Sequence, residues 1–152
     1  MVAALAAWVA IQLLLPLRHF LYPGNVSWTE QGHNFAWHQK LRDKDSDADF
    51  YVTDKDSGET WSIRESRFLS ERQKRKMSSR PHMILEFAHY LKRYYRETEG
   101  LDVEVRARVT CSLNGRRPQP LVDPEVDLAA QPRNLWHKPW IVPLRTLRPD
   151  EL

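Results

Sequence analysis

The chain changes near residue 22 from an uncharged, apolar segment to a sequence that contains many charged residues. From Met1 to Leu17 no side chain carries a charge, and the first charged residue is Arg18. The hydrocarbon core of a bilayer needs about 20 apolar residues at a rise of about 1.5 Å each, and this uncharged stretch reaches only about 25 Å. The pattern therefore predicts that residues 1–22 are the end of a transmembrane helix with its interface, and that the chain is the C-terminal part of a larger membrane protein.

Two other interpretations of the apolar N-terminus stay open. A secretory signal peptide begins with basic residues and ends at a cleavage site of small residues, and the sequence has neither feature here. A buried core helix could also have this length. The aromatic residues Phe20, Tyr22 and Trp28 favour the membrane interpretation, because aromatic side chains gather where the bilayer meets water.

Beyond the apolar segment, short runs of β-type residues predict antiparallel strands. Residues 50–53 and 60–63 are two such runs, and the connection between them contains Gly58, which is typical of a hairpin. Residues 101–109 alternate apolar and charged side chains, which is the pattern of a half-buried antiparallel strand. Residues 35–41 are a further possible strand.

Apolar side chains at helical spacing predict one long helix. They recur through residues 84–95, and Gly100 is the expected stop after a basic last turn. Weaker signals are a turn-rich link at residues 23–34, a helix start at Ser66 or Ser70, a hairpin turn at Asn114-Gly115 and a short helix near Asp127. Together these patterns predict that residues 23–152 form one α+β domain with antiparallel strands and one long helix.

The composition narrows the class of protein without identifying it. About 130 of the 152 residues lie beyond the membrane segment, which is enough for one compact domain with its own core. A net charge of +3 with 28% charged residues requires no nucleic-acid partner. Cys111 is the only cysteine, so the chain has neither an internal disulfide nor a Cys-based zinc site. Six tryptophans suit a domain that lies on a bilayer, although tryptophans in the core are the ordinary alternative.

Three groups of polar residues are candidate sites, and each has an ordinary alternative. Acidic residues alternate through residues 43–49, but an EF-hand loop needs Gly and Glu where this chain has Ala48 and Asp54, so a solvated turn is the preferred interpretation. The six histidines show no metal-binding spacing, and no metal is predicted. The basic residues within 72–80 are expected to form a solvated helix face or to attract anionic lipid headgroups.

His19 differs from the other histidines because it lies where the apolar segment gives way to polar sequence. An ionisable side chain at a membrane boundary is a candidate functional residue, since burying its charge is costly. The alternative is a histidine that merely extends to the interface. Position alone does not separate these two interpretations.

Several motifs resemble the vitamin K-dependent γ-glutamyl carboxylases, which belong with the wider bacterial set of horizontally transferred transmembrane (HTTM) proteins. The likeness runs in the same order over nearly the whole chain: Leu15-Pro16-Leu17-Arg18-His19-Phe20-Leu21, Gly24, Trp28, Phe35-Ala36-Trp37, the hairpin from Asp54 to Trp61, the helix that ends near Leu91, Asp123-Pro124-Glu125-Val126-Asp127 and Trp140-Ile141-Val142-Pro143-Leu144. The short connection between Asp123 and Trp140 suits a bacterial relative.

The resemblance implies a function as well as a fold. In these carboxylases a multi-pass membrane domain oxidises reduced vitamin K (the hydroquinone) with O2. The strongly basic species so formed removes a γ-proton from a glutamate, which then captures CO2. The lysine that activates the hydroquinone belongs to earlier membrane helices, so this fragment should not be active alone. By resemblance His19 would assist through hydrogen bonding or proton transfer, and the cofactor-binding residues are not predicted.

The resemblance also implies partners and a location. We expect an integral membrane protein whose domain at residues 23–152 is extracytoplasmic, either periplasmic or lumenal. The expected partners are membrane lipid, the rest of the multi-pass membrane domain and a glutamate-containing protein substrate, with no nucleic acid. Four tryptophans would fix the domain to the membrane part: Trp28, Trp37, Trp136 and Trp140. The alternative function is a membrane-anchored binding module without catalysis.

Overall fold

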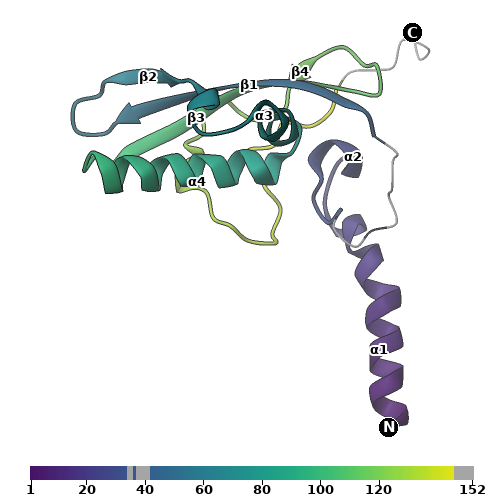
Figure 1. Cartoon of the computed structure of the whole chain (residues 1–152). Coiled ribbons are helices and arrows are strands. Elements are labelled where there is room, and N and C mark those ends of the chain that lie inside the picture. The colour runs from purple at the N-terminus through teal and green to yellow at the C-terminus, as the bar shows by residue number, and fades with distance from the viewer. Residues whose placement is uncertain (34–35, 37–41, 146–152) are drawn as a thin grey trace.

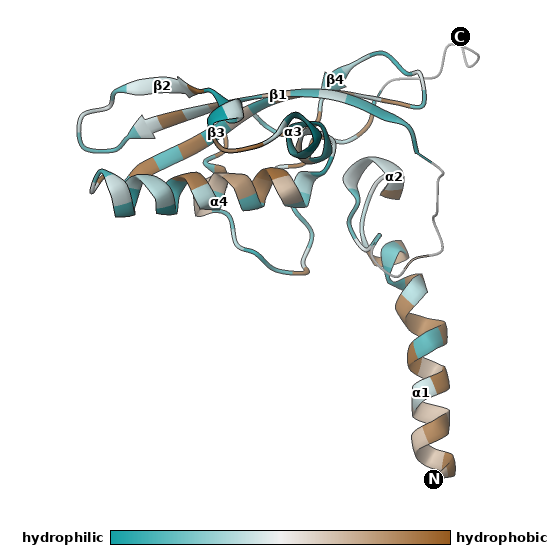
Figure 2. Ribbon diagram, viewed as in Figure 1, coloured by the Kyte–Doolittle hydropathy of each residue, from teal (hydrophilic) through white to brown (hydrophobic). Residues whose placement is uncertain are grey.

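The apolar N-terminal segment forms a helix that projects away from the rest of the fold (Figure 1). In the computed structural model, which describes residues 1–33, 36 and 42–145, α1 (Val2–Leu14) continues into the 3₁₀ helix η1 (Leu15–Leu21). The combined helix of 20 residues is long and apolar enough to cross a membrane, and none of it is buried. Figure 2 shows its apolar colouring along most of its length. These properties fit the predicted membrane segment, and the division at residue 22 stays a prediction.

Within the described residues, four antiparallel strands form a sheet in the order β2-β1-β3-β4. The strands are β1 (Lys44–Asp54), β2 (Thr60–Ile63), β3 (Val103–Leu113) and β4 (Gln119–Pro120). β1 and β3 pair along their whole length, from Lys44 opposite Leu113 to Asp54 opposite Val103. The predicted hairpin is confirmed as the pairing of β1 with β2.

Side-chain alternation explains why β3 is a strand. Every second residue from Val103 to Leu113 is buried, and the residues between them are partly or fully exposed. The predicted strand at residues 101–109 is confirmed, but β3 extends to Leu113 because Cys111 continues its buried face. Asn114 and Gly115 then adopt φ angles of 51° and 75°, which is the left-handed backbone that a tight hairpin turn requires.

The prediction of a solvated turn at residues 43–49 is wrong. β1 begins at Lys44, and its residues Asp45, Asp47 and Asp49 occupy the exposed face in register with β3. Aspartate is disfavoured in strands, but pairing along the whole of β3 overrides that local preference. The period of two in the acidic residues was therefore the signal of a strand rather than of a loop.

Two helices pack against the sheet. α3 (Glu71–Ser78) begins after Ser70, whose hydroxyl accepts a hydrogen bond from the Gln73 amide in a capping box. Ser70 is therefore the start of this helix, and Ser66 lies in the 3₁₀ turn η2 (Glu65–Arg67). α4 (Pro81–Thr98) is the predicted long helix. Its buried face consists of Pro81, Ile84, Leu85, Phe87, Ala88, Leu91 and Tyr95. The fold is α+β, as predicted.

A buried tryptophan joins the membrane-proximal segment to the C-terminal part of the domain. α2 (Val26–Thr29) is one helical turn inside the predicted turn-rich link, and the Asn25 side chain caps it by accepting from the Ser27 amide at 2.9 Å. Trp28 on this turn is fully buried, and its indole Nε1 donates to the carbonyl of Val142 at 2.7 Å. The segment that precedes the sheet in the sequence is thus joined to the segment that follows it.

Two remaining sequence predictions have different outcomes. η3 (Leu128–Ala130) is the predicted short helix, and the side chain of Asp127 caps it. The possible strand at residues 35–41 lies, apart from Ala36, outside the described residues.

The turn between β1 and β2 makes the domain sensitive to acid. The Ser57 hydroxyl donates to Asp54 at 2.6 Å and lowers the pKa of Asp54 below its ordinary value of 3.8, and the Asp56 amide adds to this effect. The stabilisation by the ionised carboxylate is complete above pH 3.8 and is lost as the pH falls through the lowered pKa.

We therefore expect Asp54→Asn to weaken the acid dependence of stability. The midpoint of urea unfolding should fall less between about pH 5 and about pH 2 in this variant than in the wild type. Asp56→Asn, in the same turn, is the matched control and should behave as the wild type. An identical pH dependence for Asp54→Asn and the wild type would contradict the assignment.

Candidate functional site

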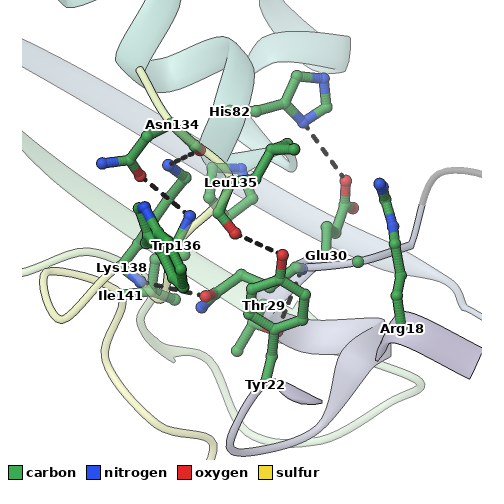
Figure 3. Close-up of a pocket in the computed structure, with 13 residues that line it drawn as sticks. Arg18, Tyr22, Thr29, Glu30, His82, Asn134, Leu135, Trp136, Lys138 and Ile141 are labelled. Carbon is green, nitrogen blue, oxygen red and sulfur yellow. Dashed lines mark hydrogen bonds and ion pairs between the residues drawn. The ribbon is translucent and has the colours of Figure 1, made fainter. Parts of the chain in front are cut away.

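A cavity of about 130 Å³ lies where η1 and α2 meet the loop that precedes Trp140 (Figure 3). It is termed the junction cavity below. Its lining comes from three parts of the chain that are distant in sequence: Arg18, Tyr22, Thr29, Glu30, Gln31 and Gly32; Pro81 and His82; and Asn134, Leu135, Trp136, Lys138 and Ile141. The cavity therefore exists only when the membrane-proximal segment is docked on the domain.

Glu30 is the acidic centre of this junction. It ends α2 with a left-handed φ of 57°, a conformation that costs a non-glycine residue about 1 kcal/mol. Its side chain is only 5% exposed and lies 3.2 Å from Lys44, 3.5 Å from Arg42 and 3.9 Å from His82. Figure 3 shows His82 and Arg18 near this carboxylate. The backbone strain at Glu30 is therefore balanced by contacts with several basic groups.

Lys44 is the main partner of Glu30, and it connects three segments. Its side chain is 4% exposed, and Nζ donates to the Trp28 carbonyl at 2.7 Å, to the Ser79 carbonyl at 3.1 Å and to Glu30 at 3.2 Å. Burial lowers the pKa of Lys44, and the neighbouring Glu30 carboxylate opposes that effect. Because Lys44 is the first residue of β1, its pairing with β3 fixes the position of the ammonium group.

Two residues that line the junction cavity each have a buried donor with no hydrogen-bond acceptor among the described residues. These donors are Nε of Arg18 and Nε2 of Gln31. The Gln31 side-chain oxygen is satisfied, because it accepts from the Lys138 amide at 3.1 Å and from His137 at 3.2 Å. An unpaired buried donor costs about 1 to 3 kcal/mol. The cavity is therefore suited to a ligand that supplies acceptor oxygens, such as a carboxylate or a carbonyl group.

His19 lies next to this cavity, on η1, and is half-buried. Its Nδ1 is 2.8 Å from the carbonyl oxygen of Pro16. Since a carbonyl can only accept, Nδ1 carries a proton, and Nε2 is the basic nitrogen of the neutral ring. A Cβ atom at Gly32 would lie 2.7 Å from the His19 Cα, so glycine permits the close approach of α2 to η1. The histidine itself does not line the cavity, but its neighbour Arg18 does.

The tryptophans predicted to fix the domain have separate environments. Trp28 and Trp140 are buried in the core. Trp136 is 79% exposed and lines the junction cavity, and Trp37 lies outside the described residues. That these residues attach the domain to the membrane part stays a prediction.

Sequence reasoning missed the charged groups of the junction. Glu30 and its partner Lys44 are 14 residues apart, and their segments show no common period or motif. No sequence pattern before Glu30 predicts its left-handed backbone. The pairing of Glu30 with Lys44 is therefore visible only in the tertiary structure. In the part of the chain that the structure describes, no group of three His, Cys, Asp or Glu side chains could hold a metal ion. Burial raises the pKa of the Cys111 thiol to about 11, so it stays protonated.

Removal of the buried carboxylate should destabilise the domain. Glu30→Gln leaves the Lys44 ammonium buried beside neutral acceptors only, and we expect a loss of about 2 kcal/mol or more in the free energy of unfolding. Chemical denaturation in detergent would measure this loss. Glu97→Gln, the same change at an exposed position of α4, is the matched control.

The double variant Glu30→Gln, Lys44→Met tests the pairing itself. Because it removes both buried charges, it should be more stable than Glu30→Gln alone. The pair would not be coupled if the double variant were as unstable as Glu30→Gln alone, or if its loss equalled the sum of the losses from the two single substitutions.

Comparison with known proteins supports the resemblance seen in the sequence. The family model described as vitamin K-dependent gamma-carboxylase, lumenal domain, matches residues 1–147. The match includes η1 with His19 and every residue that lines the junction cavity. No solved structure matches the chain significantly. Because the family model covers nearly the whole sequence, the chain belongs to the vitamin K-dependent gamma-carboxylase lumenal-domain family.

Proposed function

We propose that this chain is the membrane-boundary and lumenal part of an integral membrane enzyme that couples oxidation of reduced vitamin K to carboxylation of protein glutamate. The observation that carries this proposal is the family match over residues 1–147, which includes both the apolar helix and the domain. The chain supplies the surface that receives the substrate, and it is not active alone.

The junction cavity does not fit a vitamin K site, because its volume of about 130 Å³ is below the range of about 300 to 1,000 Å³ that is usual for ligand pockets. An apolar quinone ring needs a pocket lined mainly by apolar and aromatic side chains. The junction cavity beside His19 has apolar and aromatic residues in its lining, but Arg18, Glu30 and Lys138 place charged groups among them. When bound, reduced vitamin K with O2 would supply the strong base, and CO2 the new carboxyl group. We propose that membrane helices outside this chain bind these groups.

His19 is proposed to assist at the membrane boundary. A histidine is far too weak a base to remove the γ-proton of glutamate. Its basic Nε2 can instead accept a hydrogen bond or a proton from a more acidic group. The Pro16 carbonyl holds the ring through Nδ1, and Gly32 lies close to the backbone of His19, which suits a positioned proton acceptor.

The junction cavity is proposed to receive the carboxylate of a substrate glutamate. Among the residues that line the cavity, the cationic Arg18 and Lys138 outnumber the single carboxylate of Glu30, so the local charge is positive. The unsatisfied donors of Arg18 and Gln31 could pair with carboxylate oxygens. This arrangement supports the binding of a glutamate-containing protein substrate from the lumenal side.

Substitution of His19 tests this function in the full-length protein. We expect His19→Ala in membranes to lower the fixation of labelled bicarbonate into a glutamate peptide by about tenfold or more, with reduced vitamin K and O2 supplied. His89→Gln is the matched control: His89 lies on α4 and contacts the Gln131 carbonyl, so activity should be retained.

The pattern of products distinguishes the possible outcomes. Normal turnover by His19→Ala at normal expression would remove the proposed role of His19. The absence of both fixed label and vitamin K epoxide in the wild-type protein would contradict the carboxylase proposal and favour a membrane-anchored binding module.

A further inference from the structure

The loop between η3 and Trp140 projects two large apolar side chains into solvent. Leu135 is 75% exposed and Trp136 is 79% exposed. In Figure 1 this loop, coloured yellow-green, descends below α4 on the side toward which α1 runs. Residues 131–139 are termed the Trp136 loop. We propose that this loop inserts Leu135 and Trp136 into the bilayer interface and forms a second membrane contact beside α1.

The backbone of the Trp136 loop is held by hydrogen bonds rather than by packing of its apolar side chains. The Asn134 side chain accepts from the Trp136 amide at 3.1 Å, and the Asn134 carbonyl accepts from Lys138 Nζ at 3.0 Å. The Gln31 side chain accepts from the Lys138 amide at 3.1 Å. The loop therefore presents its apolar side chains outward in a preformed shape, so little ordering is needed for insertion.

The Trp136 loop contacts the membrane-proximal segment, and this contact places it at the proposed membrane boundary. The Tyr22 hydroxyl donates to the Leu135 carbonyl, and Tyr22 directly follows η1. At the end of η1, Phe20 and Leu21 are 76% and 83% exposed. Since the hydrogen bond to Leu135 joins the residue after η1 to the backbone of the loop, the loop lies beside the end of η1. The apolar surface of the loop thus continues that of the proposed membrane helix.

The chemistry of the loop fits lipid better than a protein partner. Tryptophan is enriched at membrane interfaces, where its ring lies among the headgroups. Basic groups flank the apolar pair: Arg133 before it, Lys138 after it, and Arg18 across the junction cavity. Such groups attract anionic headgroups. The inference depends on α1 crossing a membrane, which is part of the proposed function.

Lipid-dependent quenching tests the insertion. Trp136→Cys would carry a fluorophore in the whole chain, reconstituted in vesicles of phosphatidylcholine and phosphatidylserine with brominated acyl chains. Because Trp136 is exposed and its side chain makes no hydrogen bond that holds the fold, the variant should keep its circular dichroism spectrum. Leu135→Cys is a second site in case the first perturbs the loop. Cys111 is buried, so the unsubstituted chain gives the labelling background.

Two further positions calibrate the quenching. Trp8→Cys within α1 should be quenched strongly if the helix is in the bilayer. Glu59→Cys in the exposed β1–β2 turn should not be quenched. We expect the label at residue 136 or 135 to lose at least half as much fluorescence as the label at residue 8, and to resist quenching by iodide in water.

Three outcomes would overturn the inference. Quenching at residue 8 without quenching at 135 or 136, together with access to iodide, would place the loop in water. Protection of the loop from both quenchers would mean that protein, a second copy or another helix, covers it. Absence of quenching at residue 8 would overturn the membrane span of α1 and the loop contact together.

Discussion

The ion pair between Glu30 and Lys44 is the interaction on which the junction between the membrane-proximal segment and the domain depends. A buried ammonium group is tolerated only when charge and hydrogen bonds compensate its lost hydration. Lys44 obtains these from the ends of α2 and α3 and from Glu30. Lys44 needs these three acceptors at the same time. The pair therefore fixes where α2 meets the first residue of β1.

The position of Glu30 also determines the positions of the residues that follow it, which lie closer to the membrane boundary. With Glu30 fixed, the following residues Gln31 and Gly32 contact the Trp136 loop and η1, respectively. The charge pair in the domain thus sets where η1 meets the Trp136 loop, while the ring of His19 is held by the Pro16 carbonyl within η1. The junction cavity is a consequence of this docking, and it lies where a protein substrate would approach the membrane part that we propose.

Local patterns predicted the elements of the fold better than they predicted the site. The alternation along β3, the helical spacing along α4 and the Gly-containing hairpin turn are properties of neighbouring residues, and each was confirmed. Residues 43–49 were assigned wrongly because their acidic composition was given more weight than their period of two. The junction cavity was not predictable, since Glu30, Lys44 and Lys138 come from distant segments without a shared motif. The family resemblance suggested an assisting role for His19, whose position alone was ambiguous, and that role stays a prediction.

We propose that the substrate glutamate enters at the junction cavity of a membrane-bound carboxylase. The most direct measurement is photo-crosslinking of the full-length protein in membranes to a peptide that carries a photoreactive group next to its glutamate. Mass spectrometry of the crosslinked product would locate the attachment. We expect attachment within residues 18–32 and 134–138, and competition by the same peptide without the group. Crosslinks confined to α4 or to the β1–β2 turn would contradict it.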